Sequence, residues 1–417
     1  MEYKGFDFLK KLSFVRTAGS KEENKAYKMI VKECEKLGAK AEVEDFKIDG
    51  YNISKASVKF SSPKIEVECA GVGMSGSTPV GGVEAEFVYI ESVFAARMLD
   101  IENKICLVHA KFVDYKLYKI FTEKKVAGII VCTGDVYDSN DMIDLDPYML
   151  RNRHYTNGKI PAVCIRMTDA EKIINKNPKM VKIEVEQEEK EVKSHNVIAT
   201  IEGGKYKDEI VAFTAHYDSV AYSKGAYDNG TGTCAILQLL AYFVEHQPKR
   251  TLKFIFCGAE EIGLEGSKAY ASKHEEELKD YKLCINVDMI GVTIGRDDAI
   301  CTSNTDLVSY LKYLSCEVGF PLNVRNGIYS SDSSSLADKG VPGVSFVRSA
   351  PAGGARIHSR RDVLDHLSDA SFYKTCDFMT TFAERLINSY SFPVDRELPN
   401  NIKEDLDRYF GRKDMKI

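Results

Sequence analysis

The alternation of strand-like and helix-like segments after residue 190 constrains the fold of this chain more than any other feature. Short apolar runs typical of buried strands occur at 195–203, 209–218, 251–260, 283–291 and 341–347. Apolar residues with helical spacing lie between these runs, at 232–247, 264–280 and 306–320. Such a rhythm predicts an α/β fold with a mixed, mostly parallel sheet flanked by helices. In folds of this kind, functional side chains gather at the carboxyl ends of the strands.

The length of 417 residues exceeds one average domain core, which favours two domains or one domain with a large insert. Residues 22–37 have helical spacing, and residues 39–48 alternate as in a strand. Between 58 and 188 the apolar runs are short and β-rich, with one helix-like stretch among them. We therefore predict a discontinuous α/β domain, an inserted β-rich domain, and a C-terminal helix with a polar tail. Their expected ranges are 1–57 with 189–395, 58–188, and 396–417, respectively.

Charge and hydropathy limit the partners of the protein. With 57 basic and 62 acidic residues, its net charge of −5 disfavours nucleic acid as the main partner. No stretch of about 18 apolar residues occurs, so we expect no membrane partner. The charged N-terminus lacks a signal-peptide core, so we expect a cytoplasmic protein, with secretion only after processing or by a non-classical route. The 11 cysteines form no CxxC pair, which favours free thiols in a reducing compartment; the oligomeric state is open.

Ionisable residues follow several of the predicted strands. They lie in the segments AHYDSV, GAYDNGTG, CGAEEIG, NVDMIG and IHSRRDVLDHL. The side chains concerned are His216, Asp218, Asp228, Glu260, Glu261, Asp288 and His358. Charged groups at strand ends are costly to desolvate unless a cation offsets their charge. Imidazole and carboxylate ligands without thiolates suit catalytic zinc, and manganese or cobalt could replace it.

The number of candidate ligands favours two metal ions. Two imidazoles and three carboxylates are too many for one tetrahedral catalytic ion that also keeps a water, but they suit two ions that share a carboxylate. Glu260 and Glu261 are adjacent, so one can bind metal while the other faces the water as general base. Asp218 is placed to orient the imidazole of His216 from behind.

Together these segments resemble the co-catalytic dizinc aminopeptidases, a family whose relatives include glutamate carboxypeptidase and the transferrin receptor ectodomain. The resemblance covers residues 190–390 and the N-terminal helix and strand, and it implies a zinc exopeptidase fold that holds two Zn²⁺ ions. It also implies that Glu260 is the general base. The ligands that it implies are His216 and Asp288 for one ion, Glu261 and His358 for the other, and Asp228 as the bridge.

Two further stretches are similar to parts of this family. Residues 58–188 resemble a protease-associated domain through the runs NKICLVHA, AGIIVC and IPAVCI. Such inserts shape substrate access or protein contacts. The stretch SSDSSSLADKG, with Asp332, resembles a serine-aspartate segment that precedes the last buried strand of the family.

The chain departs from the family pattern beside the last histidine. Several relatives have a tyrosine there that helps to hold the oxyanion, and this chain has Ile357. The transition-state charge would then fall on the metals, or on a tyrosine such as Tyr329 or Tyr227. A cluster of arginines near this end is either solvated charge or a clamp on a substrate carboxylate, and it consists of Arg348, Arg356, Arg360 and Arg361.

These features predict a zinc-dependent metalloexopeptidase. Our first expectation is an aminopeptidase that acts on peptides with a free N-terminus, through a metal-bridging water and Glu260 as general base. A carboxypeptidase of the same fold could instead use the arginine cluster, and a glutaminyl cyclase would work with one zinc. A non-catalytic binding ectodomain is the alternative from another class of protein, and it would lack ligands or the general base. The sequence does not indicate which side chain the substrate carries.

Overall fold

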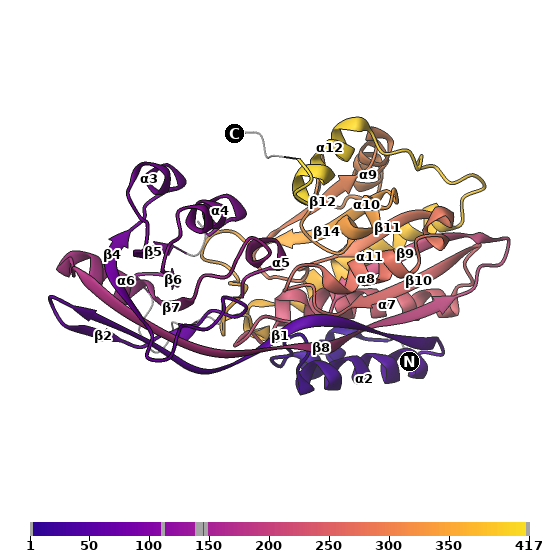
Figure 1. Ribbon diagram of the computed structural model, residues 1–417. Coiled ribbons are helices and arrows are strands. Elements are labelled where there is room, and N and C mark those ends of the chain that lie inside the picture. Colours follow the sequence, from indigo (N-terminus) through magenta and orange to yellow (C-terminus); the bar gives the residue numbers. More distant parts are fainter. Residues whose placement is uncertain (1–2, 110–112, 138–144, 146–148, 414–417) are drawn as a thin grey trace. The chain divides into compact units, whose positions relative to one another are not determined.

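The computed structural model describes residues 3–109, 113–137, 145 and 149–413, and it divides the chain into two compact units (Figure 1). The first unit comprises Met1–Ile48 and Lys193–Ile417, and the second comprises Asp49–Val192. The β-rich insert expected at 58–188 lies within the second unit. The C-terminal segment 396–417 belongs to the first.

A mixed sheet forms the centre of the first unit, with its strands in the order β13-β12-β14-β11-β9-β10-β8. The neighbours β14, β11, β9 and β10 run parallel to one another, whereas β8 and β12 are antiparallel to β10 and β14. The prediction of a mixed, mostly parallel sheet is therefore confirmed. The strands are β8 (Met180–Ile201, which begins in the second unit), β9 (Tyr206–His216), β10 (Arg250–Cys257), β11 (Tyr281–Val287), β12 (Arg296–Thr302), β13 (Leu322–Asn326) and β14 (Gly343–Ser349).

Helices cover both faces of this sheet. Along β9, Val211 and Phe213 point into one apolar cluster, and Ile210 and Ala212 point into another, as the two-residue period of a strand requires. Burial on both faces explains why the strands read as continuous apolar runs. The helices of the unit are α1 (Gly5–Leu12), α2 (Lys21–Lys36), α7 (Thr231–Glu245), α8 (Glu265–Lys273), α9 (Thr305–Val318), α10 (Ser333–Asp338), α11 (Asp369–Ile387) and α12 (Asn400–Tyr409).

Some elements differ from the sequence-based expectation. Strand β12 was not predicted, because its first residues are charged. Its Asp297 is nevertheless buried, since it accepts hydrogen bonds from Arg348 Nη1 (2.5 Å) and Thr375 Oγ1 (2.9 Å). The helix expected over 264–280 ends at Lys273, and a 3₁₀ turn, η3 (Glu277–Asp280), follows it. The strand β13 and the helix α11 were also not predicted.

The second unit contains a smaller sheet in which β4, β5, β6 and β7 run parallel to one another. These strands coincide with the predicted short apolar runs, and apolar clusters cover the two faces of the sheet. The strands are β1 (Lys40–Ser61, which begins in the first unit), β2 (Ile65–Val67), β3 (Ala70–Gly71), β4 (Val83–Tyr89), β5 (Ile105–His109), β6 (Gly128–Thr133) and β7 (Ala162–Arg166). The helices are α3 (Val93–Met98), α4 (Tyr115–Glu123), α5 (Asn152–Tyr155) and α6 (Met167–Lys176).

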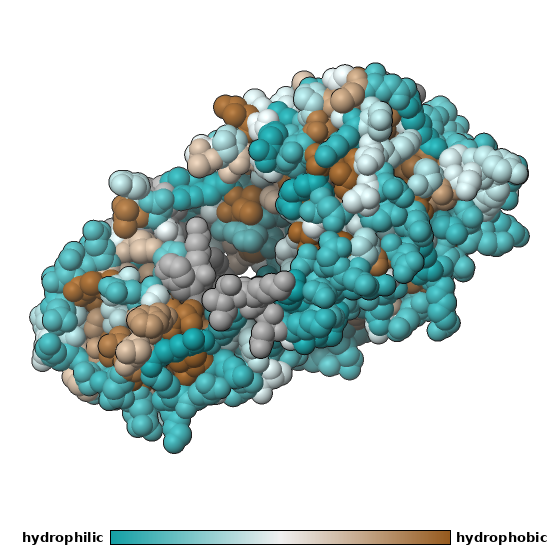
Figure 2. Space-filling view, turned by 90° about the horizontal axis from the view of Figure 1, so that it is seen from above, coloured by the Kyte–Doolittle hydropathy of each residue, from teal (hydrophilic) through white to brown (hydrophobic). Residues whose placement is uncertain are grey.

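The surface and the thiols agree with the composition. In the view of Figure 2, hydrophilic side chains cover most of the surface, and hydrophobic residues form small separate groups. Within the described residues, no helix is long and apolar enough to cross a membrane. All 11 cysteines are free thiols, as the sequence predicts.

Candidate metal centre

The candidate ligands lie where the parallel strands of the first unit end. His216 is the last residue of β9, Glu260 and Glu261 follow β10, and Asp288 follows β11. Asp228 lies in η2 (Ala226–Gly230), the turn that leads into α7. Because β9, β10 and β11 are parallel neighbours, their carboxyl ends bring these side chains to one edge of the sheet.

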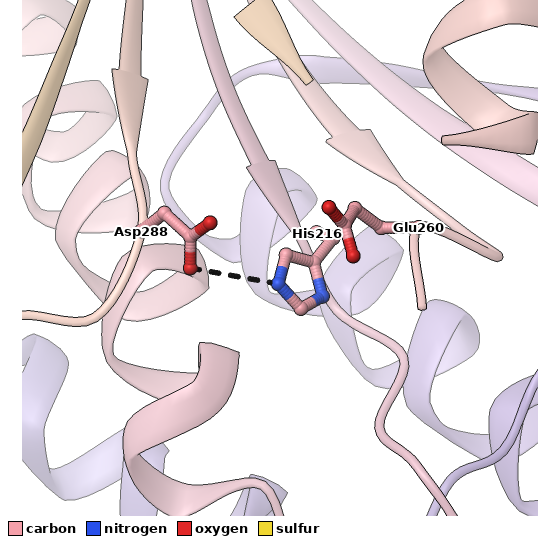
Figure 3. Close-up of side chains that lie close together, drawn as sticks. All are labelled: His216, Glu260 and Asp288. Atoms are coloured by element: carbon pink, nitrogen blue, oxygen red, sulfur yellow. Dashed lines mark ion pairs between the residues drawn. The ribbon is translucent and has the colours of Figure 1, made fainter. Parts of the chain in front are cut away.

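His216 is common to two groups of potential ligands. The ligand atoms of His216, Glu260 and Asp288 all lie within 4.8 Å of one another, and so do those of His216, Asp228 and Glu261. In the first group, Asp288 Oδ1 lies 3.6 Å from His216 Nε2, and Figure 3 shows Glu260 and Asp288 on either side of the imidazole. The two groups give the site the composition that two metal ions need.

Asp228 lies between the two histidines. Its Oδ1 is 3.3 Å from His216 Nε2, and its Oδ2 is 3.1 Å from His358 Nε2. His358 Nε2 also lies 3.1 Å from Glu261 Oε2. The two oxygens of Asp228 therefore face His216 and His358, respectively, an arrangement that suits a shared ligand, and Glu261 is near both histidines.

Burial and unpaired atoms show that this site fits divalent cations. His216, Asp228 and Asp288 are each at most 5% exposed. Among the described residues, Glu261 Oε1 and Asp288 Oδ1 are buried without a hydrogen-bond partner. Such atoms are costly unless something binds them, and carboxylate oxygens beside imidazoles are suitable zinc ligands.

The electrostatics of the site indicate the same fit. Burial raises the pKa of Glu261 to about 7, and the carboxylate of Asp228 acts in the same direction. Burial also holds the pKa of Glu260 well above its ordinary range, with Glu261 adding to the effect and His216 opposing it. Carboxylates crowded in this way stabilise a bound cation and are stabilised by it.

The Asp218 carboxylate contacts more groups of the site than the sequence predicted. Its Oδ1 lies 3.5 Å from His216 Nδ1, beside the imidazole but without a hydrogen bond to it, and the predicted orienting role stays a prediction. Its two oxygens also accept hydrogen bonds from the backbone N–H groups of Glu260 (3.1 Å) and Glu261 (3.2 Å). The preceding residue, Ala259, has a φ of 55°, a left-handed conformation that persists only where its surroundings enforce it. One buried carboxylate thus fixes the turn that carries the two glutamates and also lies beside the imidazole.

Asp362 and Asn229 fix the loop of Asp228, and neither residue was singled out from the sequence. Asp362 accepts hydrogen bonds from the backbone N–H groups of Tyr227 (2.7 Å) and Asp228 (3.1 Å). Asn229 donates to Val287 O (2.8 Å) and accepts from the N–H of Met289 (3.0 Å), so it ties this loop to the end of β11. Asp362 lies inside the segment IHSRRDVLDHL, which was the available signal for it.

Arg16 is a third residue that the sequence did not indicate. It is fully buried, and its guanidinium donates to the backbone carbonyls of Tyr217, Lys224 (2.6 Å) and Gly225 (2.8 Å). It also donates to Phe14 O (3.0 Å) in its own segment. Arg16 therefore connects the N-terminal segment to the residue that follows His216 and to the loop that precedes Asp228.

The structure corrects two expectations about substrate contacts. The Arg348 guanidinium is bound to Asp297 and donates to Val292 O (2.7 Å), so it links the neighbouring strands β14 and β12 and is not a free clamp for a substrate carboxylate. The Tyr227 hydroxyl donates to Arg348 O, and Tyr227 is only 3% exposed. Tyr329, the other tyrosine considered for the oxyanion, is half-buried.

Glu23 is a buried carboxyl near this site. Its oxygens accept hydrogen bonds from Ser194 Oγ (2.5 Å) and from the N–H of Gly19 (2.7 Å). Burial raises the pKa of Glu23 to about 8, and the carboxylate of Asp218 adds to the effect. Ionisation of Glu23 therefore costs free energy in the folded protein that it does not cost in the unfolded chain.

We expect Glu23→Gln to become more stable than the wild type as the pH rises. Between the unfolded pKa of 4.5 and the folded value of about 8, the folded state binds more protons, so the unfolding free energy of the wild type falls with pH. Glutamine cannot ionise and escapes this loss. Denaturant unfolding at about pH 5 and about pH 9, at one zinc concentration, measures the difference. The exposed neighbour variant Glu22→Gln is the control, and a pH-independent difference for Glu23→Gln contradicts the prediction.

Several known proteins are similar to this chain in sequence and in fold. A model of Peptidase family M28 matches residues 196–383, a range that contains every candidate ligand. Aminopeptidase YwaD of Bacillus subtilis is 26% identical over 382 residues, which cover 88% of this chain and 80% of the relative. Carboxypeptidase Q of Rattus norvegicus is 25% identical over 355 residues, which cover 79% and 73%, respectively. The solved structure of BSAP, a zinc aminopeptidase from Bacillus subtilis, has a TM-score of 0.77 at 22% identity and covers 96% of this chain and 98% of that chain.

Proposed function

Because the chain belongs to peptidase family M28, we propose that it is a zinc-dependent exopeptidase, and specifically an aminopeptidase that removes N-terminal residues from peptides. The observation that carries this proposal is the placement of Asp228 between two histidines, with Glu260 beside one of them. Peptide hydrolysis is the activity that the names of the relatives share. A non-catalytic binding protein would not need this complete set of residues.

The proposed cofactor is a pair of Zn²⁺ ions. The buried, unpaired carboxylate oxygens and the two imidazoles provide the donors. When bound, zinc would polarise the scissile carbonyl and lower the pKa of a water. The proposed ligands are His216 and Asp288 for one ion, Glu261 and His358 for the other, and Asp228 for both.

Glu260 is the proposed general base. It would take a proton from the attacking water and pass it to the leaving amine. Asp218 holds the backbone N–H of Glu260 and lies beside His216, so it fixes the base relative to the imidazole. Asp218 is thus a positioning residue for both groups.

The arginine cluster distinguishes an aminopeptidase, which acts at the N-terminus of a peptide, from a carboxypeptidase, which acts at its C-terminus. A carboxypeptidase needs a cation for the C-terminal carboxylate, and Arg348, one candidate for it, is bound to Asp297 and Val292. This favours the aminopeptidase. The similarity to carboxypeptidase Q keeps a carboxypeptidase as the second candidate.

Peptide digestion with and without a chelator tests the proposed function. We expect stepwise loss of N-terminal residues from free peptides and no cleavage of their N-acetylated forms. A chelator should abolish the activity, and added zinc should restore it with two ions bound per chain. Equal cleavage of the acetylated peptides from their C-termini would identify a carboxypeptidase instead. No hydrolysis and no bound metal would reject both enzymes.

A further inference from the structure

The C-terminal helix α12 packs against α10, beside which it lies in Figure 1. The apolar face of this part of the chain provides three buried residues, Leu398, Ile402 and Leu406, which form one apolar cluster with Ala337 of α10. Ile328, on the loop that precedes α10, packs against the same cluster. The segment after residue 396 is therefore more than a surface helix with a polar tail.

Two polar contacts fix the ends of this packing. The hydroxyls of Tyr409 and Ser330 form a hydrogen bond of 2.6 Å. Arg412 binds the carboxylate of Asp338 through both terminal nitrogens, with Nη1 3.1 Å from Oδ2. A bidentate pair of this kind fixes the relative orientation of its two side chains as well as stabilising their contact. Both contacts end on the same short stretch, 328–338.

On its other side, this stretch is tied to the strands that carry the candidate ligands. Ser331 Oγ accepts a hydrogen bond of 3.0 Å from Asn286 Nδ2, and Asn286 Oδ1 accepts one of 2.8 Å from Thr214 Oγ1. Asn286 lies two residues before Asp288, and Thr214 lies two residues before His216. The loop is thus held between the carboxyl ends of β9 and β11 on one side and α12 on the other.

Tyr329 lies in the middle of this loop. Its backbone carbonyl accepts hydrogen bonds from the N–H of Ser331 (2.8 Å) and from Ser334 Oγ (2.7 Å), which defines the loop conformation. Its side chain is half-buried, and burial together with the carboxylates of Asp288 and Asp228 raises the pKa of its hydroxyl. The hydrogen bond between Ser331 and Asn286 places the loop that carries Tyr329 beside the strand end that carries Asp288.

We propose that α12 braces the loop 328–332 against the sheet and thereby positions Tyr329 for the reaction. This proposal rests on the proposed function. Tyr409 and Arg412 are positioning residues, because they act through Ser330 and Asp338. The C-terminal segment is then part of the catalytic unit, and Tyr329 is the group that compensates for Ile357.

The double variant Tyr409→Phe/Arg412→Met removes both polar contacts and keeps the apolar packing. We expect kcat to fall about tenfold with KM and zinc content unchanged, because the loop would no longer hold its reactive geometry. A variant with Tyr409→Phe and Arg412→Lys should recover only part of kcat, since lysine cannot bind a carboxylate bidentately. Arg385→Met is the control, because it removes an exposed bidentate pair with Glu317 elsewhere in the same unit.

A double-mutant cycle separates positioning from a general loss of stability. Tyr329→Phe should lower kcat to a similar extent, and adding it to the brace variant should cause little further loss, because both act through one phenol. Fully additive losses, or an unchanged kcat in the brace variant, would overturn the proposal.

Hydrogen exchange tests the brace without reference to activity. The amides of 327–332 should exchange faster in the brace variant than in the wild type, and those of β9 should not change. If the wild type hydrolyses no peptide, the proposed function fails while this measurement still tests the contact. Unchanged exchange in 327–332 would show that α12 does not brace the loop.

Discussion

Glu260→Gln is expected to lower kcat for peptide hydrolysis by about 10²–10⁴-fold, the contribution of a positioned general base, and to leave zinc binding intact. Glutamine matches the shape of glutamate but cannot take a proton. The backbone N–H of residue 260 can still donate to Asp218, so the turn that carries it should keep its conformation. Steady-state kinetics on a free-N-terminus peptide, together with the zinc content of the purified variant, measure both effects.

The neighbouring carboxylate provides the discriminating comparison for this prediction. Glu261 lies 3.1 Å from His358, so Glu261→Gln should lose one zinc ion where Glu260→Gln retains two. Glu265→Gln is the matched control, because Glu265 pairs with Lys268 on the exposed face of α8. Undiminished hydrolysis by Glu260→Gln would show that another group takes the proton.

The sequence predicted the candidate ligands because their positions depend on local pattern. His216 and Asp288 each follow an apolar run, and parallel strands bring the ends of such runs together. The distances bring these residues together at one edge of the sheet, and their roles as ligands stay predictions until metal binding is measured. The sheet and its flanking helices were predictable for the same reason.

What the sequence did not indicate depends on contacts between distant segments. Arg16 lies in a loop without periodicity, and its partners are backbone carbonyls some 200 residues away, at Tyr217 and Gly225. Strand β12 was hidden because its buried Asp297 depends on Arg348 and Thr375, which are far away in the sequence. No local pattern reports such a partner.

Arg16→Met is expected to lower the unfolding free energy by about 3–5 kcal/mol, the cost of removing one member of a buried charged network. The carbonyl oxygens of Tyr217, Lys224 and Gly225 would each lose a buried donor. The nearby carboxylates of Asp362 and Asp218 would lose a compensating cation. Because two of these carbonyls flank the turns of the candidate metal centre, zinc affinity should fall together with stability.

Denaturant unfolding and zinc titration measure the two consequences of this substitution. Arg16→Lys should recover only part of the loss, since one ammonium cannot replace a guanidinium that donates in several directions. Arg385→Met removes an exposed pair and should cost at most about 1 kcal/mol. If Arg16→Met were no more destabilising than Arg385→Met, the N-terminal segment would be a neighbour of the site and not part of its support. If it is as destabilising as expected, the loops of His216 and Asp228 depend on a residue that precedes both by about half the chain.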